Sequence, residues 1–172
     1  QGFRAGRVFV TNGPLIRPTV EGHLPGHVFT ADEGTELDLQ VYLSMAAREK
    51  ISYLEIVQNG RVAYVVRLDD WAKENGKLPT IHCTESGWFL IRAVADNNDT
   101  YRFAATAPYY VEIGNRPRIS RKSAQFFLDW VEERLKQLDT SKQPREAVTA
   151  QRNELEAARR FWRNRVADAT VD

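Results

Sequence analysis

Apolar and polar residues alternate along the first two-thirds of the chain. Between residues 36 and 44, leucine or valine occupies every second position, with mostly polar side chains in between. This period of two is typical of a strand with one buried and one solvated face. Similar runs recur up to Gly114, separated by Gly, Pro, Asn and Asp. They predict further strands at residues 7–12, 51–58, 61–68, 79–84, 88–95, 102–107 and 109–113.

The Asn59-Gly60 pair stands between two of these predicted strands. Asn and Gly tolerate the positive φ that both central positions of a type I′ turn require, so residues 51–68 are expected to form a β-hairpin. About seven short strands without intervening helices favour packed antiparallel sheets over a parallel α/β fold. We therefore expect an immunoglobulin-like antiparallel β-sandwich over residues 1–114.

Beyond Gly114 the hydrophobic period lengthens to three and four residues. Ser120 is placed to cap a helix with an apolar stripe about five turns long. Residues 139–143 interrupt this stripe, and Pro144 suits the first turn of a second helix. We therefore expect an antiparallel helical hairpin, forming an appendage over residues 115–172. The two stripes are Ala124, Phe127, Leu128, Val131, Leu135 and Leu138, and Val148, Leu155, Ala158, Trp162 and Val166.

Composition places the chain among ordinary globular proteins. Of its 172 residues, 42% are hydrophobic and 27% charged, so a core can form, but two full catalytic domains would not fit. Residues 1–114 carry 11 basic against 14 acidic residues, whereas residues 115–172 carry 13 against 9. Basic residues flank two aromatic rings at residues 159–165, a pattern that also occurs in nucleic-acid binders. Because the net charge is only +1, packed rings with a solvated basic face are the preferred interpretation, and we do not expect a nucleic-acid partner.

The single cysteine, Cys83, excludes an intramolecular disulfide and a thiolate-rich metal site. No apolar run approaches the ~20 residues of a membrane helix, and residues 1–7 lack the apolar region of a signal peptide. The compartment stays open, exported or periplasmic as readily as cytoplasmic. Residues 3–5 have the pattern of the last turn of a helix that ends at Gly6, which points to a fragment of a longer polypeptide.

Candidate catalytic and metal-binding groups are scattered. His23 and His27 have the spacing of one helix face, but the Leu-Pro-Gly between them disfavours a helix. His82 adjoins Cys83 in a predicted strand, where adjacent side chains point to opposite faces. The chain contains neither a nucleophile elbow nor a phosphate-binding glycine loop. We therefore expect no catalytic residue, metal ligand or cofactor in this chain.

Aromatic residues raise carbohydrate binding as an alternative function. Trp71 lies in a polar stretch, residues 69–77, where a large ring is either exposed or folded back over the core. Tyr42 and Tyr109 fall within predicted strands. These three rings form the candidate ligand platform, and packing in the core is the competing interpretation.

The most specific string in the chain runs from Ala5 to Leu15, with the sequence AGRVFVTNGPL. It resembles the junction after the metal-binding barrel in CehA/McbA-type metallohydrolases of the PHP superfamily, where a helix ends in a Gly-Arg-x-x-x-Thr-Asn-Gly-Pro segment. A Gly-x-x-Pro-Gly turn at residues 22–26, the hairpin around residues 54–60 and a strand at residues 105–111 agree with the same family in order and spacing. The resemblance covers most of residues 5–113 and leaves the helical hairpin unmatched.

The resemblance implies an accessory C-terminal region of a metal-dependent hydrolase, whose metal ligands lie in an upstream barrel that is absent here. It predicts a non-catalytic domain that packs against, or borders, the catalytic domain of the same polypeptide. The loop of Thr11, Asn12, Gly13 and Pro14 is the candidate contact with that domain, although these residues also compose a simple tight turn. A carbohydrate-binding module is the alternative, and a stand-alone enzyme is the third interpretation.

Overall fold

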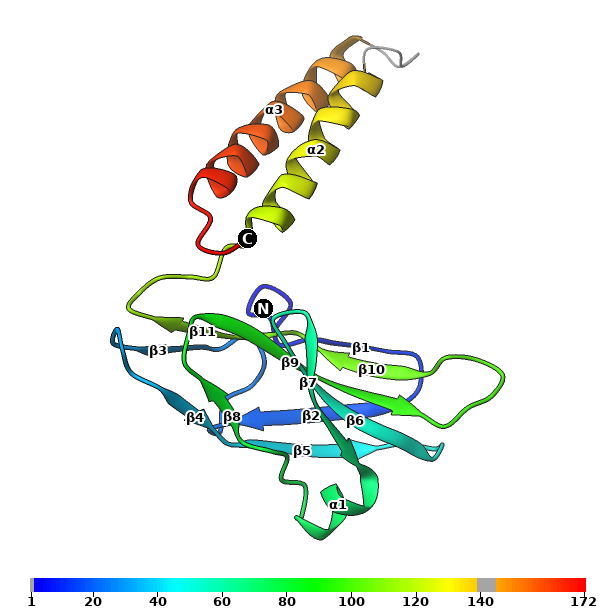
Figure 1. The fold of residues 1–172 in the computed structure, drawn as a ribbon. Helices are drawn as coiled ribbons and strands as arrows, with labels where there is room; N and C mark the ends of the chain where they lie inside the picture. The colour runs from blue at the N-terminus through cyan, green and yellow to red at the C-terminus, as the bar shows by residue number, and fades with distance from the viewer. Residues whose placement is uncertain (1, 139–144) are drawn as a thin grey trace. The chain divides into compact units, whose positions relative to one another are not determined.

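The computed structural model describes residues 2–138 and 145–172, so the predicted link at residues 139–143 and Pro144 lie outside the described residues. The chain divides into two compact units, Gln1–Pro117 and Arg118–Asp172. The first unit is a β-sandwich and the second is a helical hairpin (Figure 1). The fold class expected from the sequence is thereby confirmed.

Short strands make up most of the first unit, together with one short helix, as the period-two pattern predicts. In chain order its elements are β1 (Phe9–Thr11), β2 (Leu15–Val20), β3 (Val28–Ala31), β4 (Leu37–Leu39), β5 (Val41–Ala46), β6 (Ile51–Gln58), β7 (Arg61–Arg67), α1 (Leu68–Lys73), β8 (Ile81–Cys83), β9 (Gly87–Ala95), β10 (Phe103–Thr106) and β11 (Tyr109–Ile113).

One layer of the sandwich is a seven-stranded sheet with β9 near its centre. β6 pairs along β9 on one side and carries β7. On its other side β9 pairs with β10 near one end and with β11 near the other, and these strands carry β1 and β3. The β3–β11 pair is parallel, unlike the antiparallel sheets expected. These two strands are far apart in the chain, so no tight turn dictates their relative direction.

The second layer is built from the strand pairs β2–β5 and β4–β8. Residues 76–78 extend it, because Leu43 N donates to Gly76 O and Leu78 N donates to Val41 O. The hydrophobic core lies between the layers and takes alternate residues from each strand. Its largest fully buried side chains are Tyr109, Phe89, Leu54, Ile56, Leu78, Ile81, Ile91, Val20, Val41, Val111 and Pro14.

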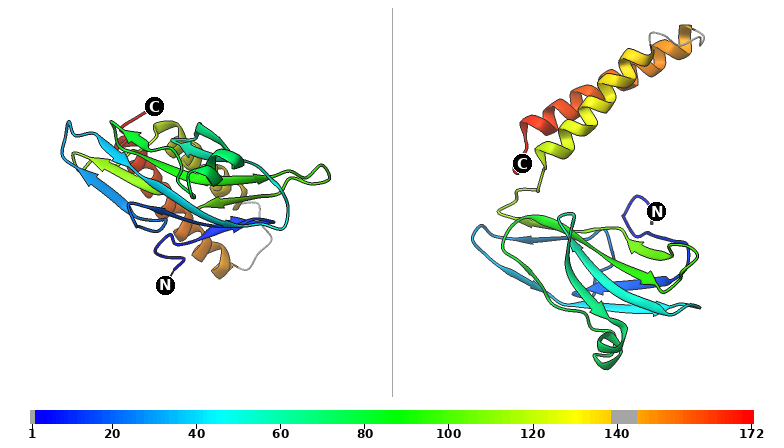
Figure 2. Two further views of the ribbon diagram at one scale, coloured as in Figure 1. Left: turned by 90° about the horizontal axis from the view of Figure 1, so that it is seen from below. Right: turned by 45° about the vertical axis from the view of Figure 1, so that its right-hand side comes forward.

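Three further features of the first unit differ from the expectation. The strand predicted over residues 36–44 is interrupted at Gln40, which lets β4 and β5 pair with different partners. β2 was not expected, and it contains Pro18, which is tolerated where a strand has a partner on one side alone. β3 and α1 are too short for a recognisable period, and α1 has no side-chain cap. Figure 2 shows α1 as a single short helix directly after β7.

The predicted Asn59-Gly60 turn is confirmed, with φ values of 51° and 83°. Asn59 also fixes the start of β9, because its Oδ1 accepts a hydrogen bond from Trp88 N at 3.0 Å. The neighbouring Gly87 makes room for this carboxamide, since a Cβ at Gly87 would lie 2.7 Å from Asn59 Oδ1. The turn therefore joins the hairpin β6–β7 to the centre of the sheet.

The helix end predicted at Gly6 is also present. Gly6 has a φ of 67°, Gly6 N donates to Phe3 O at 3.2 Å, and Arg7 N donates to Gly2 O at 2.9 Å. These two bonds have the pattern of a Schellman motif, in which glycine reverses the chain after a helical turn. After this motif the chain continues through Arg7 into β1.

The second unit consists of α2 (Arg121–Leu138) and α3 (Arg145–Ala167), which run antiparallel and side by side (Figures 1 and 2). Ser120 caps α2 as predicted, because its Oγ accepts from Ser123 N at 3.2 Å. Phe127 and Trp162 stack between the helices with ring centroids 4.6 Å apart. No helix in the described residues is long and apolar enough to cross a membrane. The buried residues of α2 are Ala124, Leu128, Leu135 and Leu138, all on the predicted stripe.

Candidate functional site

The loop of residues 11–14, the candidate domain contact, uses its polar groups within the sandwich. Thr11 Oγ1 donates to Pro14 O at 2.5 Å. The Asn12 side chain donates to Tyr101 O at 2.9 Å and accepts from Phe103 N at 2.8 Å. The loop is therefore a rigid turn tied to the β9–β10 connection, and its backbone shape is decided inside the unit.

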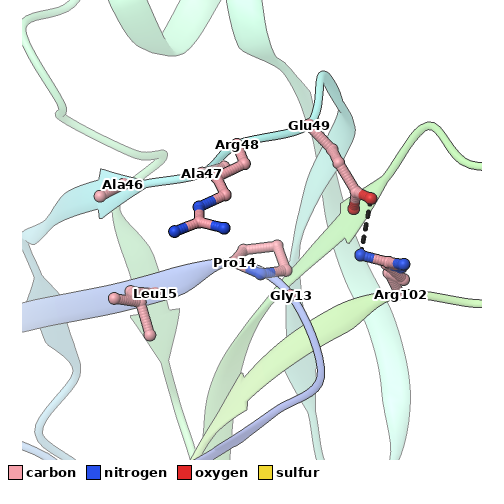
Figure 3. A pocket seen from close by; sticks show the side chains of 8 residues that line it. All are labelled: Gly13, Pro14, Leu15, Ala46, Ala47, Arg48, Glu49 and Arg102. Atoms are coloured by element: carbon pink, nitrogen blue, oxygen red, sulfur yellow. Dashed lines mark ion pairs between the residues drawn. The ribbon is translucent and has the colours of Figure 1, made fainter.

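Gly13 and Pro14 of this loop also form one wall of a pocket of about 310 Å³ (Figure 3). In Figure 3 the guanidinium of Arg48 extends over the pocket, between the two strands that frame it. At the other end, Arg102 Nη1 pairs with Glu49 Oε1 at 2.7 Å. The eight lining residues are Gly13, Pro14, Leu15, Ala46, Ala47, Arg48, Glu49 and Arg102.

The residues of this pocket suit contact with another molecule and do not suit catalysis. Its only carboxylate, Glu49, is engaged by Arg102 and also accepts from Asn97 Nδ2 at 3.2 Å. The pocket lining contains no histidine, thiol or hydroxyl that could serve as nucleophile or base. A molecule that binds in this pocket would contact a small apolar floor and one cationic side chain, Arg48, above it.

The three rings of the candidate ligand platform do not come together. Tyr109 is fully buried at 0% exposure and stacks on Phe89 with centroids 5.2 Å apart, so its assignment to a platform was wrong. Trp71 packs against the core and donates from Nε1 to Leu43 O at 3.2 Å. Tyr42 is exposed on β5. Strand parity decides this outcome, because Tyr109 occupies a position of β11 that points into the core, whereas Tyr42 occupies a position of β5 that points to solvent.

His23 and His27, set aside in the sequence analysis, do meet in the structure. Their rings stack with centroids 3.7 Å apart and planes within 11°. The two-residue turn at Glu21-Gly22, with φ values of 46° and 78°, and Gly26, with a φ of 86°, bend the chain so that both rings face the same way. The sequence signal was a glycine directly before each histidine of the His-x-x-x-His spacing, because glycine permits a turn that brings the two rings together.

His82 and Cys83 lie on opposite faces of β8, as predicted. The exposed His82 Nδ1 lies 2.7 Å from Asp38 Oδ1 across the β4–β8 pair, and Nε2 lies 3.5 Å from Glu36 Oε2. The hydrogen bond to Asp38 raises the pKa of His82. Cys83 is buried, and burial raises the pKa of its thiol to about 11. Among residues 2–138 and 145–172, no three metal-ligating side chains gather into one site.

The side of the seven-stranded sheet that faces away from the core is mainly apolar, with polar residues at its centre and at two edges, and we call it the outer sheet face. Strand register aligns its side chains in rows across the sheet. One row joins Tyr53, Val94 and Phe103, and another joins Trp88, Tyr110 and Val28. Because paired residues share a face, these rows form one continuous surface. The outer sheet face consists of Val10, Val28, Thr30, Tyr53, Glu55, Val57, Val62, Val65, Arg67, Trp88, Leu90, Arg92, Val94, Phe103, Ala105, Tyr110 and Glu112.

Several members of the outer sheet face are strongly exposed, including Val10 at 66% and Val65 at 63%. The corresponding side of the second layer is different, since β2 and β5 present Arg17, Thr19 and Ser44 there beside Leu15 and Tyr42. A sheet with one wet face normally alternates apolar and polar residues, as the second layer does. β9, with the sequence GWFLIRAVA, instead has the near-continuous apolar pattern of a strand covered on both faces.

The outer sheet face has one ion pair at its centre. Arg92 Nε donates to Glu55 Oε2 at 2.6 Å, and Glu55 is 7% exposed. Val65 and Ala105 stand beside the pair in the same row across the sheet. The charges of Glu55 and Arg92 cancel each other, so the pair places polar groups on the face without giving it a net charge.

Comparisons with known proteins found similar solved structures, but no family model and no curated protein sequence matches the chain. The chain is similar to the fibronectin(III)-like modules of Clostridium thermocellum CbhA, at 14% identity over 58% of this chain and 98% of that one, with a TM-score of 0.36. It is also similar to a Pyrococcus furiosus CARDB domain solved in complex with di-metal ions, at 13% identity over 60% and 98%, with a TM-score of 0.27.

Proposed function

We propose that this chain is a non-catalytic accessory module whose outer sheet face packs against a catalytic domain of the same polypeptide. The observation that carries the proposal is the apolar outer sheet face with its strongly exposed Val10 and Val65. Contiguous apolar patches of this kind mark interaction surfaces in soluble proteins. The resemblance of residues 5–113 to CehA/McbA-type proteins supports a metal-dependent hydrolase of the PHP superfamily as the catalytic domain.

The composition of the face favours a permanent partner over a transient one. Lasting interfaces resemble a domain core cut in half, whereas transient ones carry more polar groups. Here the charged groups at the centre are Glu55 and Arg92, which already neutralise each other. Trp88 and Tyr110 add aromatic area at one end of the face, and such rings are enriched in interface cores.

The test is hydroxyl-radical footprinting of the complete gene product and of this chain alone. We expect Tyr110, 42% exposed here, to be oxidised severalfold more slowly in the complete protein because a neighbouring domain covers it. Tyr42, 49% exposed on the other layer, is the matched control and should react equally in both samples. Equal oxidation of Tyr110 in both samples, or a gene product with no further domain, would overturn the proposal.

A pair of variants in the complete protein sharpens this test. Val65→Asp places an uncompensated carboxylate within the face and should expose Tyr110 to oxidation, because burying an unpaired charge is costly. Thr19→Asp, on the outward side of β2, should leave the footprint unchanged. Identical footprints for the two variants would contradict packing through the outer sheet face.

A further inference from the structure

A cavity of about 450 Å³ opens in the first unit where the N-terminal segment meets the turn before β3. Three of its lining residues carry ionisable groups, namely Arg7, His23 and His27, and all three are basic. The other lining residues are small or apolar: Ala5, Gly22, Leu24, Pro25 and Gly26. The cavity therefore presents hydrogen-bond donors and positive charge, with no acidic group in its wall.

Close backbone contact sets the shape of this cavity. Gly26 has a φ of 86°, and its N donates to Pro108 O at 2.9 Å. A Cβ at Gly26 would overlap the carbonyl oxygen of Ala5, and a Cβ at Gly6 would lie 2.9 Å from Gly26 Cα. Only glycine permits this approach. Because of these two glycines, the segment that contains Arg7 packs directly against the turn that contains both histidines.

In the part of the first unit that the structure describes, no ion pair joins Arg7, His23 or His27 to a carboxylate. The adjacent acidic residue, Glu21, accepts a hydrogen bond from Gln40 N at 2.6 Å through its Oε1. Within the described residues, no ion pair or side-chain hydrogen bond engages the guanidinium of Arg7. The counter-charge for this group must therefore come from solution or from a ligand.

The stacked rings strengthen the case for an anion. Burial, and next the charge of His23, lower the pKa of His27. Two imidazolium rings with centroids 3.7 Å apart would repel each other, and the attraction of an anion placed against both would offset that repulsion. Behind the pair stand Phe29, edge-on to His27 at 4.6 Å, and Tyr109, whose hydroxyl donates to His23 O at 3.2 Å. These groups are uncharged, and His23 is the charged group that acts on His27, while Arg7 lines the same cavity.

We propose that this cavity binds a phosphate-type oxyanion. The planar guanidinium of Arg7 supplies paired N–H donors, which match two oxygens of a phosphate. Imidazole N–H groups of His23 and His27 supply the remaining donors. The ligand is either free phosphate or a small phosphate monoester, because the cavity is open to solvent and two of its basic side chains, Arg7 and His23, are exposed.

The experiment is an NMR titration of the whole chain with inorganic phosphate at pH 6.0 and constant ionic strength. The chain contains three histidines, and His82 is a built-in control because Asp38 and Glu36 flank it. We expect saturating shifts of the His23 and His27 ring signals, while His82 stays in place. A parallel titration with methyl phosphate distinguishes the monoester from the free ion by its affinity, and acetate tests the anion class.

Two arginine variants complete the design. Arg7→Gln should weaken phosphate binding by at least about tenfold, as expected for loss of a charge-assisted pair. Arg17→Gln, on the outward side of β2, should bind like the unaltered chain. His27→Asn should also weaken phosphate binding, and it replaces Arg7→Gln if that variant fails to fold. An unchanged position of the His82 signal shows that a variant is folded.

Three results would overturn the proposal. One is a set of linear, unsaturating shifts at all three histidines, the mark of an ionic-strength effect. Another is unaltered phosphate affinity in folded Arg7→Gln or His27→Asn. The third is acetate binding as tightly as phosphate, because a carboxylate would then satisfy the site equally well.

Discussion

Cys83 and His82 are neighbours in β8, yet they experience opposite environments. His82 is exposed beside two carboxylates, whereas Cys83 is 3% exposed and accepts a weak hydrogen bond from Gln58 Nε2 at 3.9 Å. The difference follows from strand geometry, which turns adjacent side chains to opposite faces. At this scale, exposure decides the reactivity of a group more than its chemical type does.

Cys83 is expected to resist thiol reagents in the folded chain. Burial raises its pKa to about 11, so the thiolate, which is the reactive form, is nearly absent at pH 8. In a Cys83 assay with a chromogenic disulfide reagent at pH 8, we expect slow reaction of the native chain and one thiol per chain in guanidinium. Prompt stoichiometric reaction of the native chain would contradict the buried position.

At the scale of elements, the helical hairpin carries two tryptophans in different surroundings. Trp162 of α3 is partly buried and stacks on Phe127, whereas Trp130 of α2 is 57% exposed. Arg163 Nη2 pairs with Glu132 Oε1 at 3.2 Å across the two helices, with both groups largely in solvent. Ring packing between the helices is therefore expected to stabilise the hairpin more than its ion pairs do.

The two tryptophans give a matched test of hairpin stability. Trp162→Ala should destabilise the hairpin by about 2–4 kcal/mol, slightly less than full truncation of a core tryptophan. Trp130→Ala and Arg163→Ala should stay within about 0.5 kcal/mol, as exposed positions do. Urea unfolding followed by helical circular dichroism measures all three. Equal destabilisation by the two tryptophan changes would show that the stack is not the stabilising contact.

At the scale of the whole molecule, potential ligands for a metal are spread over separate places. His23 and His27 share one cavity with Arg7, and His82 lies on the β4–β8 pair with acidic neighbours. In neither place do the described residues bring three ligating side chains together. Structural metal sites usually require four ligands and catalytic ones at least three.

The purified chain is accordingly expected to contain far less than one equivalent of metal. Elemental analysis after dialysis measures this, and His23→Asn and His82→Asn variants locate any metal that is found. About one bound zinc or manganese ion per chain, lost in either variant, would refute the expectation.

Some features could be predicted because they depend on residues close in the chain. The Asn59-Gly60 turn, the Ser120 cap and the glycine-ended turn at Gly6 are each set by a few consecutive residues, and each is observed. The alternation along residues 51–68 fixes which positions share a face, and the longer period after Gly114 distinguishes helix from strand. Local backbone sterics and the periodicity of buried positions are enough to predict these features.

Tertiary structure decided the features that depend on residues far apart in the chain. Which face of a strand meets the core depends on partners far away in sequence, so Tyr109 is buried and Tyr42 exposed although both looked alike. The rows of the outer sheet face exist only because β6, β9, β10 and β11 pair in one register. Likewise, Arg7 and His27 share a cavity because Gly26 admits the N-terminal segment. Contacts between distant segments carry no periodic signal, so only the folded chain reveals them.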